Sequence, residues 1–144
     1  MKTLVIDANI FVKPFLQEED SEKAREFLSV CLENDINLLV PSLFQYEAFS
    51  VLRKKGIGYS LAKRTLLKFL NVNLKVVEFD LDIAEKAFEI SSKGHKKTGF
   101  PTFYDSSYHA LAMLNDCDFI TADRRHYEKT KELGHIRLLS DEHV

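Results

Sequence analysis

The stretch TLVIDAN at residues 3–9 joins a short run of β-branched and apolar residues to an acid, Asp7. A run of this length and composition is typical of a buried β-strand. Segments of the same character recur along the chain at residues 37–40, 74–79, 118–121 and 136–139. Helical patterns separate them, and strands that alternate with helices form parallel sheets with both faces covered. The sequence therefore predicts an α/β fold, a three-layer α/β/α arrangement around a central, mostly parallel five-stranded sheet.

The helical segments between these strands have recognisable ends. We expect them at residues 7–15, 20–33, 43–55, 60–70, 80–91, 104–115 and 124–133. Pro14 is expected to shorten or kink the first of them, because proline lacks the N–H group that a helix interior needs. Ser42 and Gln45 form a capping-box pattern for the third. No internal repeat or linker interrupts the series, so residues 1–144 are predicted to form a single domain.

Composition and charge exclude several classes of protein. Apolar residues make up 45% of the 144 and charged residues 29%, which is a globular balance, and no apolar run is long enough for a membrane helix. The net charge of −2 argues against a protein that coats nucleic acid by bulk charge. Two cysteines, Cys31 and Cys117, are too few for a disulfide framework. Because the N-terminus also lacks a signal-peptide pattern, we expect free thiols and a cytoplasmic location.

Four acids are expected to meet at one edge of the sheet. Asp7 directly follows the first strand, and Asp123 follows the fourth by two residues. Asp105 and Glu47 lie in the first turns of two helices, which in such folds begin where strands end. Four carboxylates brought together raise one another's pKa unless a cation neutralises them. Oxygen ligands alone favour Mg²⁺ or Mn²⁺, so the pattern predicts a metal site suited to phosphoryl transfer.

Each of these acids also has a purely structural interpretation. Asp7 and Asp123 are well placed to cap the helices that follow them. Glu47 lies in a helix that is apolar nearly all round, where an unpaired acid is costly, and it could instead pair with Arg53 or Arg64. The set of four is therefore a stronger argument for a metal site than any single member.

Four segments of the chain resemble the motifs of PIN-domain nucleases. They are V-I-D-A-N-I-F at 5–11, P-S-L-F-Q-Y-E at 41–47, Y-D-S-S-Y-H-A-L-A at 104–112 and F-I-T-A-D at 119–123. More narrowly, they resemble the VapC-type toxins of prokaryotic toxin–antitoxin pairs. The resemblance implies a PIN-like fold in which the catalytic and metal-binding carboxylates are Asp7, Glu47, Asp105 and Asp123. It also implies that Asn9 and Thr121 support these carboxylates through hydrogen bonds.

The resemblance further implies an activity and two partners. The activity is Mg²⁺- or Mn²⁺-dependent endonucleolytic hydrolysis of RNA phosphodiester bonds. The partners are an antitoxin, seated in a groove along the helices at 20–33 and 43–70, and a second copy of the chain in a homodimer. Relatives often carry an aromatic residue where this chain has His126, and some carry a further acid where it has Arg124 and Arg125. This departure leaves one or two ions per site open.

Basic residues near two of the acids are candidates for contact with substrate. Lys96 and Lys97 lie in the polar loop that leads to Asp105, and Arg124 and Arg125 directly follow Asp123. We expect these side chains to contact RNA phosphates, although a solvated surface would look the same. His109 shares a helix face with Asp105, and we expect a packed or hydrogen-bonded histidine at the edge of the site.

Other functions fit the pattern less well. A phosphatase of the haloacid-dehalogenase type needs D-x-D after the first strand, but the third position is Asn9. No Ser or Cys is arranged with a base as a nucleophile would be. The alternative that stays open is a catalytically weak PIN-fold module that binds RNA or protein without cutting.

Overall fold

The computed structural model describes residues 2–94, 97 and 99–142 of the chain. Its strands are β1 (Thr3–Ile6), β2 (Asn37–Pro41), β3 (Leu74–Val77), β4 (Asp118–Thr121) and β5 (Ile136–Leu138). They form one sheet in the order β3-β2-β1-β4-β5, and every neighbouring pair is parallel. The predicted five-stranded α/β fold is confirmed.

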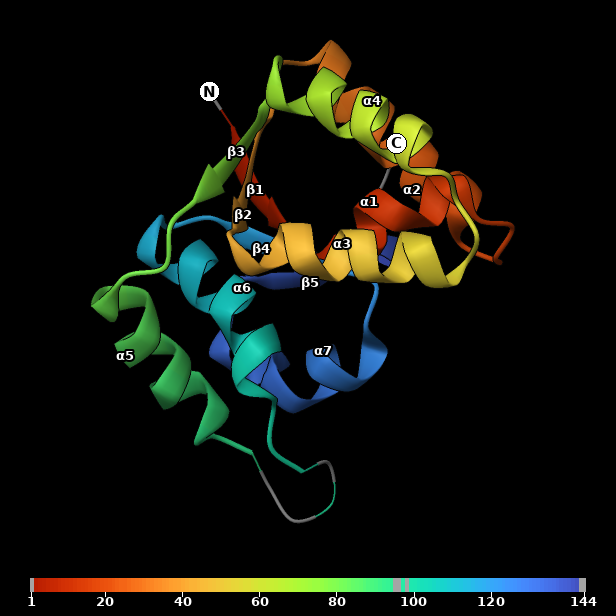
Figure 1. The fold of residues 1–144 in the computed structure, drawn as a ribbon. Coiled ribbons are helices and arrows are strands. Elements are labelled where there is room, and N and C mark those ends of the chain that lie inside the picture. Colours follow the sequence, from red (N-terminus) through yellow and green to blue (C-terminus); the bar gives the residue numbers. More distant parts are fainter. Residues whose placement is uncertain (1, 95–96, 98, 143–144) are drawn as a thin grey trace.

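Seven α-helices connect these strands. They are α1 (Ala8–Val12), α2 (Ser21–Glu33), α3 (Leu43–Lys54), α4 (Tyr59–Leu70), α5 (Leu81–Ser91), α6 (Phe103–Leu114) and α7 (Arg124–Thr130). The helices α1 to α4 connect strands on one side of β1, and α5 to α7 lead to the strands on the other side. Because crossovers between parallel strands are right-handed, this reversal places the two groups on opposite faces of the sheet. Figure 1 shows α1, α2 and α4 above β4 and β5, and α5, α6 and α7 below them.

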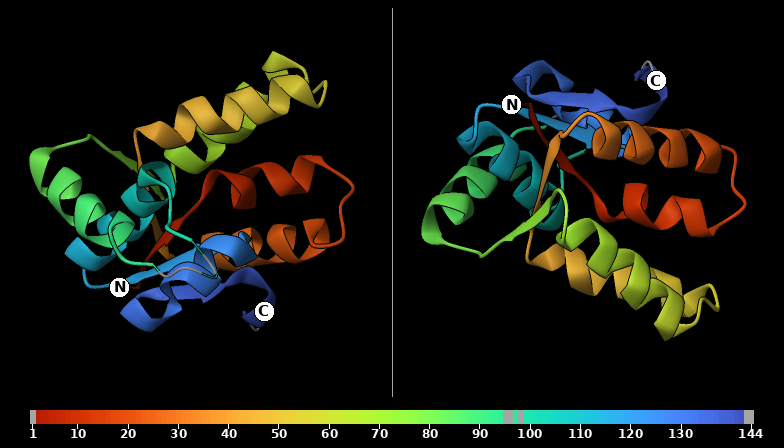
Figure 2. Two further views of the ribbon diagram at one scale, coloured as in Figure 1. Left: turned by 90° about the horizontal axis from the view of Figure 1, so that it is seen from below. Right: turned by 90° about the horizontal axis from the view of Figure 1, so that it is seen from above.

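The helices lie in pairs outside the sheet. The helices α3 and α4 are joined by a short turn at one margin of the molecule (Figure 2), and Figure 1 shows them spreading apart from it. The pair α5 and α6 forms the most extensive helix contact on the other face. Between α1, α3 and α4, the ring of Phe11 lies 5.5 Å from that of Phe44 and 6.0 Å from that of Phe69. This aromatic cluster anchors the α1–α4 layer to the sheet.

The strand order reverses between β1 and β4, and ligands in open α/β sheets bind at the carboxyl ends of the strands beside such a reversal. In the register of these two strands, Ile6 lies opposite Ile120. The next residues, Asp7 and Thr121, therefore stand level with each other at the edge of the sheet. This register brings Asp7, near the N-terminus, beside residues that lie more than 110 positions later in the chain.

Several predicted boundaries differ from the structure. Pro14 does shorten the first helix, since α1 ends at Val12 and a 3₁₀ turn follows at Lys13–Phe15. The prediction of a capping box at Ser42 was wrong, because this residue has helical backbone angles and its side chain makes no cap hydrogen bond. The third strand ends at Val77 rather than at residue 79. Within the described ranges, no helix is long and apolar enough to cross a bilayer.

Candidate active site

Asp7 is held at the carboxyl end of β1 by hydrogen bonds to both of its oxygens. Its Oδ1 accepts from the Ile10 N–H at 3.1 Å, which caps α1. Its Oδ2 accepts from the Thr121 hydroxyl at 2.6 Å and from the Ala122 N–H at 3.3 Å. The Asp7 residue is only 8% exposed. The capping interpretation is therefore correct for one oxygen, while the other faces the end of β4.

Thr121 joins Asp7 to a second acid. Its hydroxyl oxygen accepts a hydrogen bond from the Asp123 N–H at 3.0 Å while its proton goes to Asp7. The Asp123 Oδ1 in turn accepts from the N–H groups of Arg125 and His126, at 2.9 and 3.2 Å, and so caps α7. One threonine hydroxyl thus links the carboxylate of Asp7 to the backbone of Asp123, 116 positions away in the sequence.

Glu47 belongs to the same edge through a tyrosine. The Tyr108 hydroxyl of α6 donates to Glu47 Oε1 of α3 at 2.6 Å, so this bond ties together helices from opposite faces of the sheet. Neither predicted arginine is the partner of Glu47, and Arg64 donates instead to the Ser60 carbonyl. The Tyr108 ring stacks on Phe119 of β4 at 5.6 Å, which fixes the position of its hydroxyl.

Asp105 is the electrostatic centre of the four acids. It lies in the first turn of α6, where its N–H donates to the Thr102 hydroxyl oxygen at 3.0 Å. Burial raises the pKa of the Asp105 carboxyl first, and the charge of Asp123 raises it further. Lys129 of α7 is the cation that lowers it. The charge of Asp105 in turn raises the pKa values of both Asp7 and Glu47.

The pKa of Asp7 indicates that the fold by itself stabilises this carboxylate poorly. Burial raises the pKa of Asp7 from 3.8 to about 6, even though three hydrogen bonds to its carboxylate act in the opposite direction. Burial also raises the pKa of Glu47. Carboxylates that repel one another in this way are stabilised by an added cation. All the donors are oxygens, which fits Mg²⁺ or Mn²⁺.

The side chains are not yet gathered as ligands. Across the described part of the chain, no three His, Cys, Asp or Glu residues form a group that could hold a metal ion. The acids are close enough to shift one another's pKa values but are not arranged as a closed coordination shell. Donor chemistry thus fits a hard cation, and ligand closure would have to accompany its binding.

The remaining predicted residues lie in different places. Thr121 makes the expected hydrogen bond to a carboxylate, whereas Asn9 is exposed and makes none to the four acids among the described residues. Arg124 and Arg125 are exposed at the start of α7, next to Asp123. Lys97 is exposed, and Lys96 lies outside the described residues. The substrate role of these basic side chains stays a prediction.

Two histidines lie beneath the acids rather than among them. His109 is fully buried with its Nε2 at 2.8 Å from the Gly134 carbonyl oxygen, so it is the packed histidine that was expected. His126 packs its ring against His109 and Phe119, where relatives often carry an aromatic residue. Burial lowers the pKa of His126 to about 4, so this ring is neutral at physiological pH.

Two residues of the site did not emerge from the sequence as site residues. Tyr108 lies inside the motif at 104–112 but was not singled out there, and Lys129 was not among the basic candidates. The signal for Tyr108 was its position three residues after Asp105, which places both on one helix face. Lys129 had no comparable signal, because its approach to Asp105 depends on how α7 packs near α6.

Fold and site together define an α/β protein with an acidic site at the switch point of a parallel sheet. The sequence matches the PIN domain family over residues 4–132, and the chain belongs to that family. PIN domains are generally nucleases. The family resemblance predicted from the four motifs is therefore confirmed. A search of curated proteins found no significant match.

Solved structures with this fold include toxins of toxin–antitoxin pairs. A toxin–antitoxin complex from Klebsiella pneumoniae superposes with a TM-score of 0.69 at 15% identity, covering 94% of this chain and 97% of that one. FitAcB from Neisseria gonorrhoeae gives 0.69 at 16%, covering 96% and 99%. The Mycobacterium tuberculosis toxin VapC20, which cleaves the sarcin–ricin loop, gives 0.67 at 12%, covering 87% and 93%. At these identities the likeness shows the shared fold.

Proposed function

We propose that this protein is a metal-dependent endoribonuclease and the toxin of a VapBC-type toxin–antitoxin pair. The observation that carries the proposal is the set of four acids at one sheet edge, Asp7, Glu47, Asp105 and Asp123. Burial, and then the charge of a neighbouring acid, raises the pKa values of Asp7, Glu47 and Asp105, so the site favours a bound cation. The likeness to toxins of known pairs supports the choice of RNA as substrate.

The four acids would hold one or two Mg²⁺ or Mn²⁺ ions. Such an ion supplies a hydroxide near neutral pH and stabilises charge on the phosphate oxygens. The chain's own contribution is to position the ligands. Thr121 holds Asp7 and Asp123 in register, and Tyr108 holds Glu47. Lys129, with Arg124 and Arg125 on the same helix, would attract the phosphate groups of RNA.

The direct test is RNA cleavage with Mg²⁺ or Mn²⁺, compared with the same reaction in excess EDTA. We expect cleavage that EDTA abolishes and that Asp7→Asn and Asp105→Asn each remove. Cleavage that survives chelation and both substitutions would contradict the proposal. Circular dichroism of both variants separates loss of chemistry from loss of folding.

A PIN-fold binding module is the second candidate. The absence of a ready-made metal-binding group in the described residues favours it. Such a module would bind single-stranded RNA in a gel-shift assay but would release no shorter products at any Mn²⁺ concentration. Wild-type protein that binds RNA without cutting it would favour this function over the first.

The antitoxin would bind an apolar groove formed by α1, α2 and α4. This groove has a volume of about 420 Å³, and Phe11, Leu28, Leu61 and Phe69 contribute to its walls. The groove was expected along the helices at 20–33 and 43–70; residues of α2 and α4 line this one, and residues of α3 do not. Co-expression with the product of a neighbouring small gene, followed by co-purification of the wild type but not of Leu61→Asp, an exposed residue of the groove, would support this partner.

We also propose that residues 1–144 form one domain and that two copies of the chain form a homodimer. We place this homodimer in the cytoplasm. Phe79, Leu81 and Phe88 form an exposed apolar surface at α5, which supports a second copy as a partner. Cys31 and Cys117 are free, as expected for a reducing compartment. A monomer mass in light scattering at micromolar concentration would contradict the dimer.

A further inference from the structure

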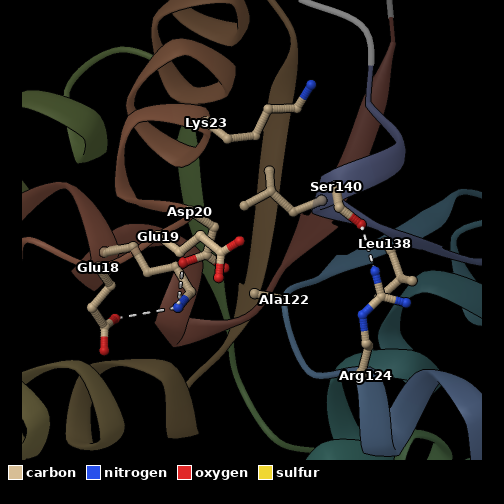
Figure 3. A pocket seen from close by; sticks show the side chains of 10 residues that line it. Glu18, Glu19, Asp20, Lys23, Ala122, Arg124, Leu138 and Ser140 are labelled. Carbon is tan, nitrogen blue, oxygen red and sulfur yellow. Dashed lines mark hydrogen bonds and ion pairs between the residues drawn. The ribbon is translucent and has the colours of Figure 1, made fainter.

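A cavity of about 540 Å³ lies next to the acids, with Ala122, which follows Thr121, in its lining. Ala122 lines it and also donates its N–H to Asp7, so the cavity shares a wall with the site. Its volume lies in the range of small-molecule binding sites. Figure 3 shows Glu18, Glu19 and Asp20 on one side of it and Arg124 on the other.

The walls of this cavity differ in character. One wall is acidic and comes from residues 18–20, just before α2. The opposite wall carries Arg124 of α7, and the floor between them is apolar, formed by Ala122, Leu138 and Leu139. A flat apolar group with polar edges matches this combination, since its faces meet the floor and its edges meet the walls.

Most of the polar groups in the cavity already have partners. Lys13 Nζ lies 3.3 Å from Glu18 Oε1 and 2.9 Å from Asp20 Oδ1, so these two acids share one cation. The Lys23 ammonium donates to the Glu142 carbonyl oxygen. Glu19 is different, because it makes no hydrogen bond or ion pair within the described part of the chain.

Arg124 is the second group available to a ligand. Its guanidinium makes one long hydrogen bond, from Nη2 to Ser140 Oγ at 3.4 Å. Since a guanidinium has five N–H donors in a fixed fork, most of its capacity stays open. Arg124 also directly follows Asp123, so a phosphate bound at the acids would lie near it. Glu19 and Arg124 thus offer an acceptor pair and a donor fork on opposite sides of one cavity.

The chemistry of RNA bases selects among occupants. Proteins read single-stranded RNA by hydrogen bonds to the Watson–Crick edges of splayed-out bases. A carboxylate only accepts, through two adjacent oxygens. Guanine offers two adjacent donors on that edge, its N1–H and its amino group. Cytosine and adenine place an acceptor next to the amino group, and uracil places acceptors on both sides of its N3–H.

We propose that this cavity binds the base of the nucleotide next to the scissile phosphate, and that Glu19 selects guanine there. The base would rest on Leu138 and Leu139 with its Watson–Crick edge toward Glu19, while Arg124 contacts a neighbouring phosphate. The inference rests on the proposed ribonuclease function, because it assigns the cavity to the same substrate. It makes Glu19 a specificity-determining residue.

Binding of mononucleotides tests the cavity without any cleavage. GMP and UMP carry the same phosphate, so a difference between them reports the base. In NMR titrations of the full chain in EDTA, we expect GMP to shift the amide signals of Glu19, Ala122 and Arg124 and to bind on the order of tenfold more tightly than UMP. Equal affinities, or shifts elsewhere, would overturn the proposal.

Two substitutions sharpen this test. Glu19→Gln replaces one acceptor by a donor, so we expect GMP affinity to fall on the order of tenfold while UMP affinity holds. Glu26→Gln is the matched control, an exposed glutamate of α2 outside the cavity, and should change neither. A Glu19→Gln variant that binds GMP as the wild type does would also overturn the proposal.

Sequencing of cleavage products from a randomised RNA separates the two proposals. We expect wild-type cuts to have guanine at one fixed position beside the cleaved bond, with that preference lost in Glu19→Gln. If wild-type protein cuts no RNA, the ribonuclease proposal fails while the mononucleotide titration still decides the cavity. If it cuts with no base preference, the ribonuclease proposal stands and the role of Glu19 is overturned.

Discussion

The two edges of the sheet carry the same kind of residue in opposite surroundings. At the amino edge, Asp118 Oδ2 lies 3.2 Å from Arg137 Nε, and His135 lies 3.9 Å from both Asp118 and Asp116. At the carboxyl edge, Asp105 lies close enough to Asp7, Glu47 and Asp123 for their charges to couple. The fold therefore supplies cations to the acids at one edge and places acids beside acids at the other.

This difference indicates which acids serve the fold and which serve function. Asp118 at the amino edge is paired with the guanidinium of Arg137, so the chain itself supplies its counter-charge. Acids that raise one another's pKa values weaken the fold unless an external cation binds, and stored unfavourable charge of this kind is typical of functional sites. The comparison can be broken or sharpened by exchanging aspartate for asparagine at each edge.

The largest expected effect is on RNA cleavage, and it distinguishes two aspartates at opposite ends of β4, Asp123 and Asp118. Asp123→Asn should lower RNA cleavage on the order of 10³-fold, because a metal contact contributes several kcal/mol to the transition state. Asparagine keeps the oxygen that caps α7, so the fold should survive. Asp118→Asn is the control at the amino edge and should leave cleavage unchanged. Equal activity of the two variants under saturating Mn²⁺ would break the comparison.

The second effect is a gain in stability when the buried acid at the carboxyl edge loses its charge. The pKa of Asp7 is about 6 in the fold against an ordinary 3.8, so the folded state binds the extra proton and the fold loses up to about 3 kcal/mol as pH rises through that window. In EDTA at pH 7, Asp7→Asn should raise the free energy of unfolding by roughly 1–3 kcal/mol, partly offset by a mismatch with the Ala122 N–H.

Urea denaturation from pH 4 to 8 measures this gain. Asp80→Asn is the matched control, since Asp80 caps α5 through the same contact to the third following N–H but is exposed. Asp118→Asn should show the opposite sign, a loss of at most about 1 kcal/mol, because it breaks an ion pair at the surface. An Asp7→Asn variant less stable than the wild type at pH 8 would be incompatible with an uncompensated charge.

The third effect is stabilisation by metal. Mn²⁺ at a hundred times its dissociation constant should add about 2.7 kcal/mol to the stability of the wild type. Because Asp105 is the centre of the acid cluster, Asp105→Asn should lose most of this gain, whereas Asp118→Asn should keep it. Thermal melts with and without Mn²⁺ measure the difference. If Mn²⁺ does not change the melting temperature of the wild type, the four acids do not bind this cation, and the prediction is wrong.

The smaller of the two expected effects on cleavage concerns the hydrogen bond that joins α3 to α6. Tyr108→Phe removes the donor to Glu47 and should cost about 1–3 kcal/mol of stability, as hydrogen bonds to charged groups do. Cleavage should fall about 10- to 100-fold, because residues that orient metal ligands have effects of this size. Tyr127→Phe is the control, a partly buried tyrosine whose hydroxyl makes no hydrogen bond among the described residues, and should change neither quantity.

Much of the fold could be predicted from the sequence because its signals are local. The composition of runs such as Thr3–Ile6 and Asp118–Thr121 predicts strands, and the ends of all five strands were predicted to within two residues. The capping box at Ser42 was the local signal that misled. The Ser42 backbone is helical rather than extended, and its side chain makes no cap bond. Its N–H, which a capping box would pair with Gln45, is instead paired with the Val77 carbonyl of β3.

The candidate site divides in the same way. That Asp7 and Asp123 share an edge follows from parallel strands alone, which is a rule of topology. The contact between Glu47 and Tyr108 does not follow from any spacing, since the two residues are 61 positions apart and belong to different helices, α3 and α6. The cavity at Glu19 was equally invisible, because its two walls come from residues 18–20 and from α7.

By itself, the sequence determined the order of strands and helices and the family, and it predicted four acids at one edge of the sheet. Each of these depends on residue type and short-range spacing, which the chain states directly. Only the tertiary structure decided which acids would find a cation within the fold and which would face one another. That outcome depends on how α3, α6 and α7 pack across the sheet, because charge interactions act through distances in space rather than along the chain.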